Sequence, residues 1–279
     1  MSLSRRLQCA LIVIAACWLA PAARAQGFDV PYVPTPFVVV EEMLRLANVK
    51  ADDFVMDLGS GDGRILIAAV RKFGARGVGV DLDPDRIAES VYNAQLYGVS
   101  DRVAFHLADL FKFDIAEASV ITMYLLPSVN IKLRPRLLRL KPGTRIVSHD
   151  FDMEDWVPDQ KSTIRKNVFM WIVPAQVDGR WRATIALPAG ERSYSIEIKQ
   201  KFQEIDGLAR YDKKVAGLWN AKLTGDRISF VMVDDSGPVE SNLYFEGRVT
   251  GDAMEGTIRR GVGKEEVRIP WRADRASAQ

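Results

Sequence analysis

The stretch that most constrains the fold is residues 54–65, in which a short apolar run ends at Asp57 and three glycines follow at alternate positions. Residues 64–72 then have the composition of the start of a helix. A strand, a glycine loop and a helix in this order form the first unit of a nucleotide-binding α/β sheet. The glycines let the backbone lie close to a ligand, and the start of the helix supplies free amide donors.

The spacing of the glycines distinguishes between ligands. A dinucleotide site needs glycines in a G-x-G-x-x-G frame, but here Arg64 occupies the third slot and Gly63 comes one position early. The carboxylate of Asp57 would repel a diphosphate and attract the ammonium group of an amino-acid moiety. The loop therefore argues against an NAD-dependent enzyme. A purely structural turn is the alternative interpretation.

Two further short apolar runs also end in an acid. Residues 76–80 precede Asp81, about twenty positions after Gly61, where the hydroxyl groups of a ribose need an acceptor. Residues 103–108 precede Asp109. Three strands that each end in an aspartate at one edge of a sheet suit a nucleoside with a cationic tail.

The loop Asp57-Leu-Gly-Ser-Gly-Asp-Gly closely resembles motif I of class I S-adenosylmethionine (SAM) methyltransferases. The resemblance implies an α/β fold with a Rossmann-like sheet, helices on both of its faces, and SAM as the cofactor. It also implies that Asp109 approaches the adenine amine. The residues expected to bind the cofactor are Asp57, Gly59, Ser60, Gly61, Gly63, Asp81, Leu82, Asp109 and Leu110.

Two more segments narrow the resemblance: Pro-Tyr-Val-Pro-Thr at residues 31–35 and Trp-Val-Pro-Asp at residues 156–159. With the glycine loop, and over roughly residues 29–160, they look like a group of small protein-lysine methyltransferases. The resemblance implies that Tyr32 and Thr35 line the entrance for the cofactor or the substrate lysine. The substrates of that group do not transfer, because this chain has a bacterial-looking leader and an added C-terminal region.

The substrate is expected to lie where the next two strands end. Residues 119–127 are expected to form the fourth strand, which runs into the active-site edge at Tyr124-Leu-Leu-Pro127. Enzymes that methylate planar amides or adenine often carry Asn/Asp-Pro-Pro-Tyr here, so that substrate class loses support. Asn130 begins an expected helix over residues 130–140. We expect both Pro127 and Asn130 to contact the substrate.

The chemistry of an amine acceptor indicates the catalytic residues. A lysine amine has an ordinary pKa of about 10.4 and is mostly charged at neutral pH. Methyl transfer requires that its proton is removed and that the nitrogen lies in line with the methyl group. Tyr124 and Asp150, at the ends of the fourth and fifth expected strands, are the expected catalytic residues. Two histidines in different settings and no cysteine after residue 25 indicate that no catalytic metal is present.

The N-terminal 25 residues have the layout of a secretory signal peptide. Two arginines at residues 5–6 precede an apolar run over residues 7–20, and a small-x-small pattern ends at Ala25. A membrane span needs roughly twenty apolar residues, so an uncleaved membrane anchor is the alternative. We therefore expect a periplasmic or secreted protein, although SAM is made in the cytosol.

The charge of the chain bears on its partners. Removal of residues 1–25 takes away three arginines and no acid, so the formal charge goes from 38 − 36 = +2 to 35 − 36 = −1. A nucleic-acid-binding domain carries a basic surface, which this balance does not indicate. We expect a protein substrate, no nucleic-acid partner, and membrane association only through an uncleaved leader.

The pattern changes from about residue 168 onwards. Helical periodicity stops, and short β-rich runs alternate with glycine turns. Residues 223–228 and 249–254 form a weak repeat, each a tight turn between strands. The pattern indicates an antiparallel barrel or sandwich, whose first one or two strands could instead complete the preceding sheet.

The sequence thus predicts three parts: a signal peptide over residues 1–25, a methyltransferase domain over residues 26–170 and a smaller antiparallel β domain over residues 171–275. The predicted function is SAM-dependent methyl transfer to an amine, with a protein lysine as the preferred acceptor. The alternative is an exported envelope binding protein that keeps the nucleoside-binding shape and acts through its β domain.

Overall fold

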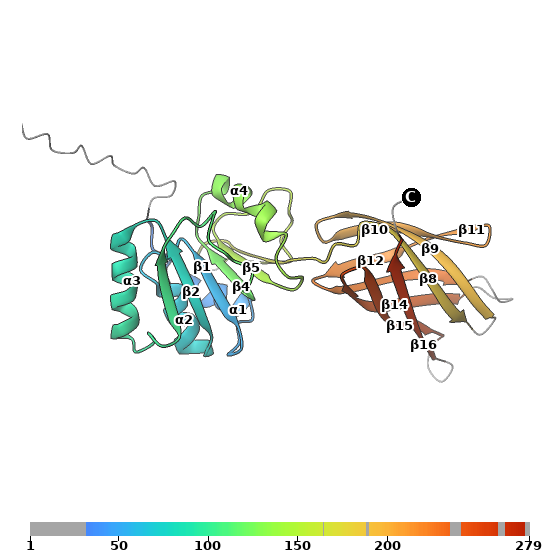
Figure 1. Ribbon diagram of the computed structural model, residues 1–279, viewed down its shortest axis with the longest axis horizontal. Helices are drawn as coiled ribbons and strands as arrows, with labels where there is room; N and C mark the ends of the chain where they lie inside the picture. The colour runs from blue at the N-terminus through green and yellow to red at the C-terminus, as the bar shows by residue number, and fades with distance from the viewer. Residues whose placement is uncertain (1–31, 164, 188–189, 235–240, 262–265, 277–279) are drawn as a thin grey trace, which may run out of the picture.

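The computed structural model describes residues 32–163, 165–187, 190–234, 241–261 and 266–276. These residues form an α/β unit and an antiparallel β unit, which lie side by side in Figure 1. The predicted signal peptide lies outside the described residues. Among the helices that are described, none is long and apolar enough to cross a membrane.

The α/β unit is built on a seven-stranded sheet with the order β3-β2-β1-β4-β5-β7-β6. Strands β1 to β5 are parallel, whereas β7 runs antiparallel to both β5 and β6. Parallel strands bring their carboxyl ends to one edge, so Asp57, Asp81 and Asp109 lie along the same edge of the sheet, as predicted. The strands are β1 (Phe54–Leu58), β2 (Arg76–Asp81), β3 (Val103–Leu107), β4 (Val120–Met123), β5 (Arg145–His149), β6 (Gln160–Ser162) and β7 (Val168–Ile172).

Helices cover both faces of this sheet, which confirms the predicted class I methyltransferase architecture. The helices are α1 (Phe37–Leu46), α2 (Arg64–Phe73), α3 (Pro84–Leu96) and α4 (Pro127–Leu137). Helices α1 and α2 pack against one face, where Val40 and Leu66 are fully buried in one apolar cluster. Helix α4 covers the other face, where Leu133 and Leu137 are buried in a cluster with Trp156.

The helix starts follow from the local sequence. Asp83 caps α3, because its carboxylate accepts a hydrogen bond of 2.8 Å from the amide of Asp85. The expected helix over residues 130–140 is wrong by three residues at each end, since α4 spans Pro127–Leu137. Leu126 is extended and Pro127 has the φ that suits the first helical position. The fourth strand, expected over residues 119–127, therefore ends early, at Met123, because Pro127 already begins α4.

The β unit is a nine-stranded antiparallel sheet with the order β11-β10-β9-β8-β16-β15-β14-β13-β12. Its strands are β8 (Gly179–Leu187), β9 (Gly190–Lys201), β10 (Glu204–Tyr211), β11 (Lys214–Gly217), β12 (Trp219–Thr224), β13 (Arg227–Asp234), β14 (Ser241–Thr250), β15 (Ala253–Arg260) and β16 (Val267–Arg275). Strand β10 also contacts β12, and β11 contacts β13. The sheet therefore nearly closes on itself, which decides for a barrel rather than a sandwich.

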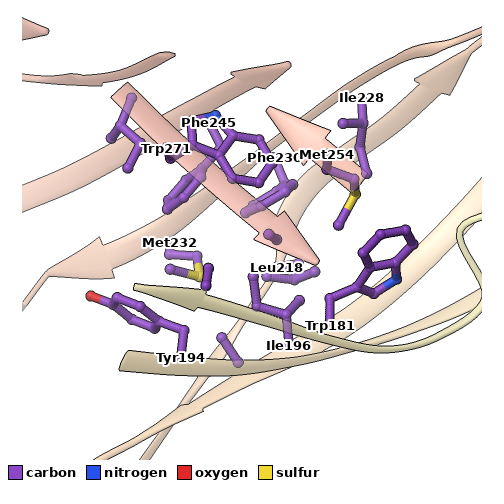
Figure 2. Close-up of a cluster of buried hydrophobic side chains, with 14 of the residues drawn as sticks. Trp181, Tyr194, Ile196, Leu218, Ile228, Phe230, Met232, Phe245, Met254 and Trp271 are labelled. Atoms are coloured by element: carbon purple, nitrogen blue, oxygen red, sulfur yellow. The ribbon is translucent and has the colours of Figure 1, made fainter. Parts of the chain in front are cut away.

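Side chains fill the interior of this barrel. Alternate residues of β8 are buried, as expected for a strand with one face in a core. Figure 2 shows large side chains from several strands pointing toward one another, among them Trp181, Phe230, Phe245 and Trp271. Phe230 stacks on Phe245 with ring centroids 4.5 Å apart, and Trp271 meets the ring of Phe245 edge-on at 5.3 Å. The interior is therefore a packed core.

The turn between β9 and β10 packs on the α/β unit. The ring of Phe202 stacks on Trp156 at 5.7 Å between centroids. The indole nitrogen of Trp156 donates a hydrogen bond of 2.9 Å to the side-chain oxygen of Gln203. The side-chain nitrogen of Gln203 donates one of 2.6 Å to the carbonyl of Val157. The side-chain amide of Gln203 is thus bonded at both ends, and it fixes the segment that follows β5.

Candidate functional site

A pocket of about 470 Å³ opens at the carboxyl edge of the parallel strands. Its volume lies in the usual range for small-molecule sites. The predicted residues that line it are Tyr32, Thr35, Asp57, Gly59, Ser60, Gly61, Asp81, Leu82, Asp109, Leu110 and Tyr124. Four other residues of the predicted site do not line it: Gly63, Pro127, Asn130 and Asp150.

Asp57 is the buried acid of the pocket, with an exposed fraction of 1%. Thr122 donates a hydrogen bond of 2.7 Å to its Oδ1 atom, while Oδ2 has no hydrogen-bond partner among the described residues. Burial raises the pKa of this carboxyl from 3.8 to about 7, against the lowering effect of the Thr122 hydrogen bond, and the charge of Asp81 raises it further. A bound cation would satisfy the free oxygen and restore the charge.

The other two acids have fixed positions. The two carboxylate oxygens of Asp81 accept hydrogen bonds from the amides of Gly61 at 2.9 Å and Asp83 at 3.0 Å. Asp109 accepts one of 2.9 Å from the amide of Phe111. Both acids are only partly buried. Because a carboxylate oxygen has two acceptor positions, each acid can still accept from hydroxyl or amine groups of a ligand.

Two positions in the loop require glycine for different reasons. Gly61 has a φ of +52°, and a Cβ atom there would lie 2.6 Å from Cε2 of Tyr32. Gly63 precedes α2 with a φ of +79°, and a Cβ atom there would lie 2.7 Å from the ring of Phe105. Gly61 therefore lets Tyr32 lie across the loop, whereas Gly63 lets α2 pack closely on the neighbouring strand.

Residues 32–36 cross over the glycine loop and form one wall of the pocket. The guanidinium group of Arg64 donates a hydrogen bond of 2.9 Å to the carbonyl of Thr35. The hydroxyl of Thr35 is hydrogen-bonded to Nδ1 of His149 at 3.1 Å, and Arg86 lies 4.5 Å above the ring of Tyr32. The sequence reasoning missed Arg64 and Arg86 as pocket residues. The signal for Arg64 was its place as the first residue of the helix after the loop.

Tyr124 lies in the pocket on a buried histidine. The ring centroids of Tyr124 and His149 are 3.9 Å apart. His149 is 1% exposed, and its Nε2 has no partner in the described part of the chain. Burial lowers the pKa of the His149 imidazole, while the charge of Asp150 opposes this effect. The imidazole is therefore neutral at pH 7 and supports Tyr124 without adding a positive charge.

Two of the predicted residues that do not line the pocket, Asp150 and Asn130, make other contacts in the α/β unit. Asp150 has a φ of +66°, and its carboxylate accepts a hydrogen bond of 2.9 Å from Lys166. Asn130 is fully buried, and its amide nitrogen donates to the carbonyls of Phe151 and Asp152 at 3.3 Å each. Asn130 thus holds the segment after β5. The substrate contacts of Asn130 and Pro127, and the catalytic role of Asp150, stay predictions.

The described residues contain no group of three or more His, Cys, Asp or Glu side chains that could hold a metal ion. The pocket instead offers carboxylates at three separate positions, on Asp57, Asp81 and Asp109. This separation suits the three polar parts of one long ligand: an ammonium group, ribose hydroxyls and an adenine amine. SAM has these parts, and the unpartnered oxygen of Asp57 fits its ammonium group.

Comparison with known proteins agrees with this geometry. Residues 57–160 match the family model of the ANTKMT methyltransferase domain. A protein-lysine N-methyltransferase from Saccharolobus islandicus is 48% identical over 133 residues, which are 47% of this chain and 83% of that protein. An adenine nucleotide translocase lysine N-methyltransferase from Mus musculus is 36% identical over 47% of this chain, and the chain spans 57% of its length.

A solved structure agrees as well. It is an RNA methyltransferase from Salinibacter ruber in complex with S-adenosyl-L-homocysteine, with 53% sequence identity and a TM-score of 0.51. The match covers 52% of this chain and 96% of that chain. S-Adenosyl-L-homocysteine is what SAM becomes when it loses its methyl group, so the pocket belongs to an enzyme that uses SAM. The chain is a class I SAM-dependent methyltransferase and belongs to the family of the ANTKMT methyltransferase domain.

Proposed function

We propose that this enzyme methylates the side-chain amine of a lysine in a protein. The main support is the part of the pocket where the acceptor would lie. Tyr124 and Leu125 line it, and the segment at residues 124–127 is Tyr-Leu-Leu-Pro, not the Asn/Asp-Pro-Pro-Tyr that enzymes acting on planar amides often carry. The name of the Saccharolobus islandicus relative, a protein-lysine N-methyltransferase at 48% identity, supports the same acceptor.

The residues around the cofactor have separate proposed roles. SAM carries the methyl group on a positively charged sulfur. This sulfur is the leaving group, and it needs no further activation. Asp57 pairs with the ammonium group, Asp81 accepts from the ribose hydroxyls, and Asp109 accepts from the adenine amine. Tyr32, packed on Gly61, closes the pocket over the loop. These contacts fix the direction of the methyl group, which is the main requirement of this reaction.

The acceptor amine must arrive without its proton. Leu125 and Val129 line the pocket near Tyr124, and an apolar surrounding disfavours the charged form of a lysine amine. The hydroxyl of Tyr124 can accept a hydrogen bond from the neutral amine and direct its lone pair toward the methyl group. His149 lies beneath Tyr124 as an uncharged ring that supports it. Tyr124 and Asp150 are the two candidates for accepting the proton that the lysine amine must lose first.

We also propose a cellular location, for which the N-terminal sequence is the support. The signal-peptide pattern in residues 1–25 leads us to propose a periplasmic or secreted enzyme, or one anchored by an uncleaved leader. Such an enzyme needs either SAM outside the cytosol or contact with SAM before export.

Isotope transfer tests the proposed function. The full chain is incubated with SAM carrying a labelled methyl group and with envelope proteins, and the products are separated and digested for mass spectrometry. We expect the label on a lysine side chain of a protein, and a much weaker signal with Tyr124→Phe. Label in added RNA instead would contradict the lysine acceptor. A folded protein that binds SAM and transfers no label would favour the envelope binding protein.

A further inference from the structure

The β unit carries a second hollow, of about 1270 Å³, on the outer face of strands β12–β16. This face points away from the packed core that Figure 2 shows. We call the hollow the outer groove. Its cations are Lys222, Arg227, Arg248, Arg259, Arg268 and Arg272, and its acids are Glu246 and Glu255.

The positive charge is concentrated in this groove and is not a property of the whole unit. Residues 171–279 hold seventeen lysines and arginines and sixteen aspartates and glutamates, a net charge of +1. The groove lining holds six cations against two acids, and the acids beside it, Asp226, Glu266 and Asp274, pair with only three of these cations. Hydroxyl groups of Thr224, Ser229 and Thr257 lie between the charges and add neutral hydrogen-bond donors.

Two pairs of arginines oppose each other directly across neighbouring strands. Arg227 on β13 is paired in register with Arg248 on β14, and Arg259 on β15 with Arg268 on β16. Like charges in such positions destabilise a sheet. Arg248 and Arg268 have acidic partners in Asp226 and Glu266. Within the described chain Arg227 and Arg259 form no ion pair, so each arginine pair keeps an uncompensated charge that an anion would neutralise.

The spacing of these pairs indicates the kind of anion. Tyr244, opposite Arg259, lies four residues before Arg248 on β14. The two arginine pairs are therefore separated by about 14 Å along the strands and by two strand spacings across them, roughly 17 Å in all. An extended polypeptide covers this distance in about five residues. A peptide with two acids at that separation would neutralise both pairs.

Glu246 excludes the other polyanions. It lies on β14 between the two pairs, opposite Thr257. Each strand of a DNA duplex has a phosphate about every 3.4 Å along the helix axis, and this continuous charge would bring a phosphate against the Glu246 carboxylate. A planar lipid surface binds a protruding face of a protein, and the outer groove is concave, so a lipid surface does not fit it. A peptide can place an amide or a lysine between its two acids and so match Glu246.

We propose that the outer groove binds an acidic segment of the protein that is methylated. The proposal rests on the proposed lysine acceptor, and it gives the β unit the role of holding the substrate protein while its lysine reaches the pocket. The two arginine pairs bind carboxylates about five residues apart, and Arg is suited to them because its guanidinium group binds a carboxylate with two hydrogen bonds.

Fluorescence anisotropy with the full chain tests this. The probe is a labelled twelve-residue peptide with two acids five residues apart and a lysine between them. The comparison probes are the same peptide with glutamines for acids, an oligouridylate and phosphatidylglycerol vesicles. The groove variant is Arg227→Gln with Arg259→Gln. The matched control, Lys199→Gln with Arg210→Gln, removes the same charge from exposed positions on β9 and β10.

We expect saturable binding of the acidic peptide that weakens with salt, a loss of at least tenfold in the groove variant, and less than a twofold change in the control. The thermal midpoint of the groove variant should stay close to that of the parent, because relief of like-charge repulsion offsets the loss of the contact between Arg259 and the Tyr244 ring. Binding of the glutamine peptide with equal affinity would overturn the proposal. So would tighter binding of the oligouridylate or the vesicles, if the groove variant abolished it.

Activity on a short lysine peptide without acids separates the two proposals. The groove variant should methylate this peptide like the parent protein. If methylation persists and the acidic peptide binds both proteins equally, the groove inference fails and the lysine acceptor stands. If neither protein methylates any lysine, the proposed function fails. Binding of the acidic peptide would then indicate a binding protein whose partner is not methylated. That result would overturn the groove inference as well, because the inference requires a methylated partner.

Discussion

Thr122 donates a hydrogen bond of 2.7 Å to one oxygen of the Asp57 carboxylate and leaves the other oxygen without a partner in the described part of the structure. Both residues lie on neighbouring central strands and are almost completely buried. A buried acid that is half satisfied costs stability in the free protein. The cost would be recovered if a cation bound the free oxygen, which is why we propose that Asp57 pairs with the ammonium group of SAM.

The stability of the SAM-free protein should show this cost. The folded-state pKa of Asp57 is about 7, above the ordinary value of 3.8. Between these two values the folded protein holds a proton that the unfolded chain has lost, so the free energy of unfolding falls as the pH rises through this window. Asp57→Asn should unfold at a higher temperature than the parent at pH 8, measured by differential scanning calorimetry. The exposed Asp101→Asn is the control, and a lower midpoint for Asp57→Asn would contradict the account.

The same substitution should weaken cofactor binding. A hydrogen bond to a charged group contributes about 1.5–3 kcal/mol, so Asp57→Asn should raise the dissociation constant for SAM roughly 10- to 100-fold. Calorimetric titration measures this. Unchanged affinity in a variant that is also more stable would show that the free oxygen of Asp57 does not face the ammonium group.

Cofactor binding should depend on pH with a maximum near neutrality. Below about pH 7 Asp57 is protonated, and binding of an ammonium group must displace that proton. Above a pKa of about 7.7–8.0 the α-amino group of the ligand loses its own charge. Affinity should therefore rise by up to tenfold per unit from pH 5 toward pH 7 and fall again above pH 8. Titrations in two buffers of different ionisation enthalpy should show proton release at pH 6. Equal affinity from pH 5 to pH 9 would contradict this assignment.

Tyr124 and Asp150 can be separated by kinetics. Tyr124→Phe keeps the ring on His149 and removes the hydroxyl, so it should lower kcat by roughly 100-fold while the affinity for SAM stays within twofold. Asp150→Asn should change kcat less, because the Asp150 carboxylate is paired with Lys166 and does not line the pocket. The measurement is single-turnover methyl transfer at saturating SAM. A larger loss with Asp150→Asn would make Asp150 the proton acceptor.

The contact between the two units should contribute measurably to stability. Gln203→Ala leaves the buried indole N–H of Trp156 without its acceptor, and such a loss costs about 1–3 kcal/mol. Urea unfolding followed by tryptophan fluorescence measures it, with the exposed Gln95→Ala as the control. If both variants unfold at the same urea concentration, the turn between β9 and β10 does not stabilise the α/β unit.

The parts of the fold that depend on local pattern could be predicted from the sequence. Asp57, Asp81 and Asp109 each end an apolar run, and parallel pairing then places them at one edge. Asp83 and Pro84 mark the start of α3. The start of α4 was missed, because Leu-Leu-Pro127 reads as a strand end and as a helix start equally well.

Contacts between distant residues could not be predicted. Thr35 and His149 are 114 positions apart, and nothing in either segment indicates the hydrogen bond that holds the pocket wall. Trp156 belongs to a motif that the sequence singled out, yet its partner Gln203 lies in a different unit. The outer groove could not be predicted from composition either, because acids elsewhere in the β unit balance the charge of its arginines.

The most direct test of the account is a calorimetric titration of the protein with SAM, beside Asp81→Asn. We expect one SAM site per chain at pH 7.5, and an affinity at least tenfold weaker in the variant, because residue 81 would lose its charge toward the ribose hydroxyls. The loop must stay folded, which the unfolding temperature of the variant checks. A folded protein that does not bind SAM, or one that binds it equally well with and without the Asp81 carboxylate, would contradict the central claim.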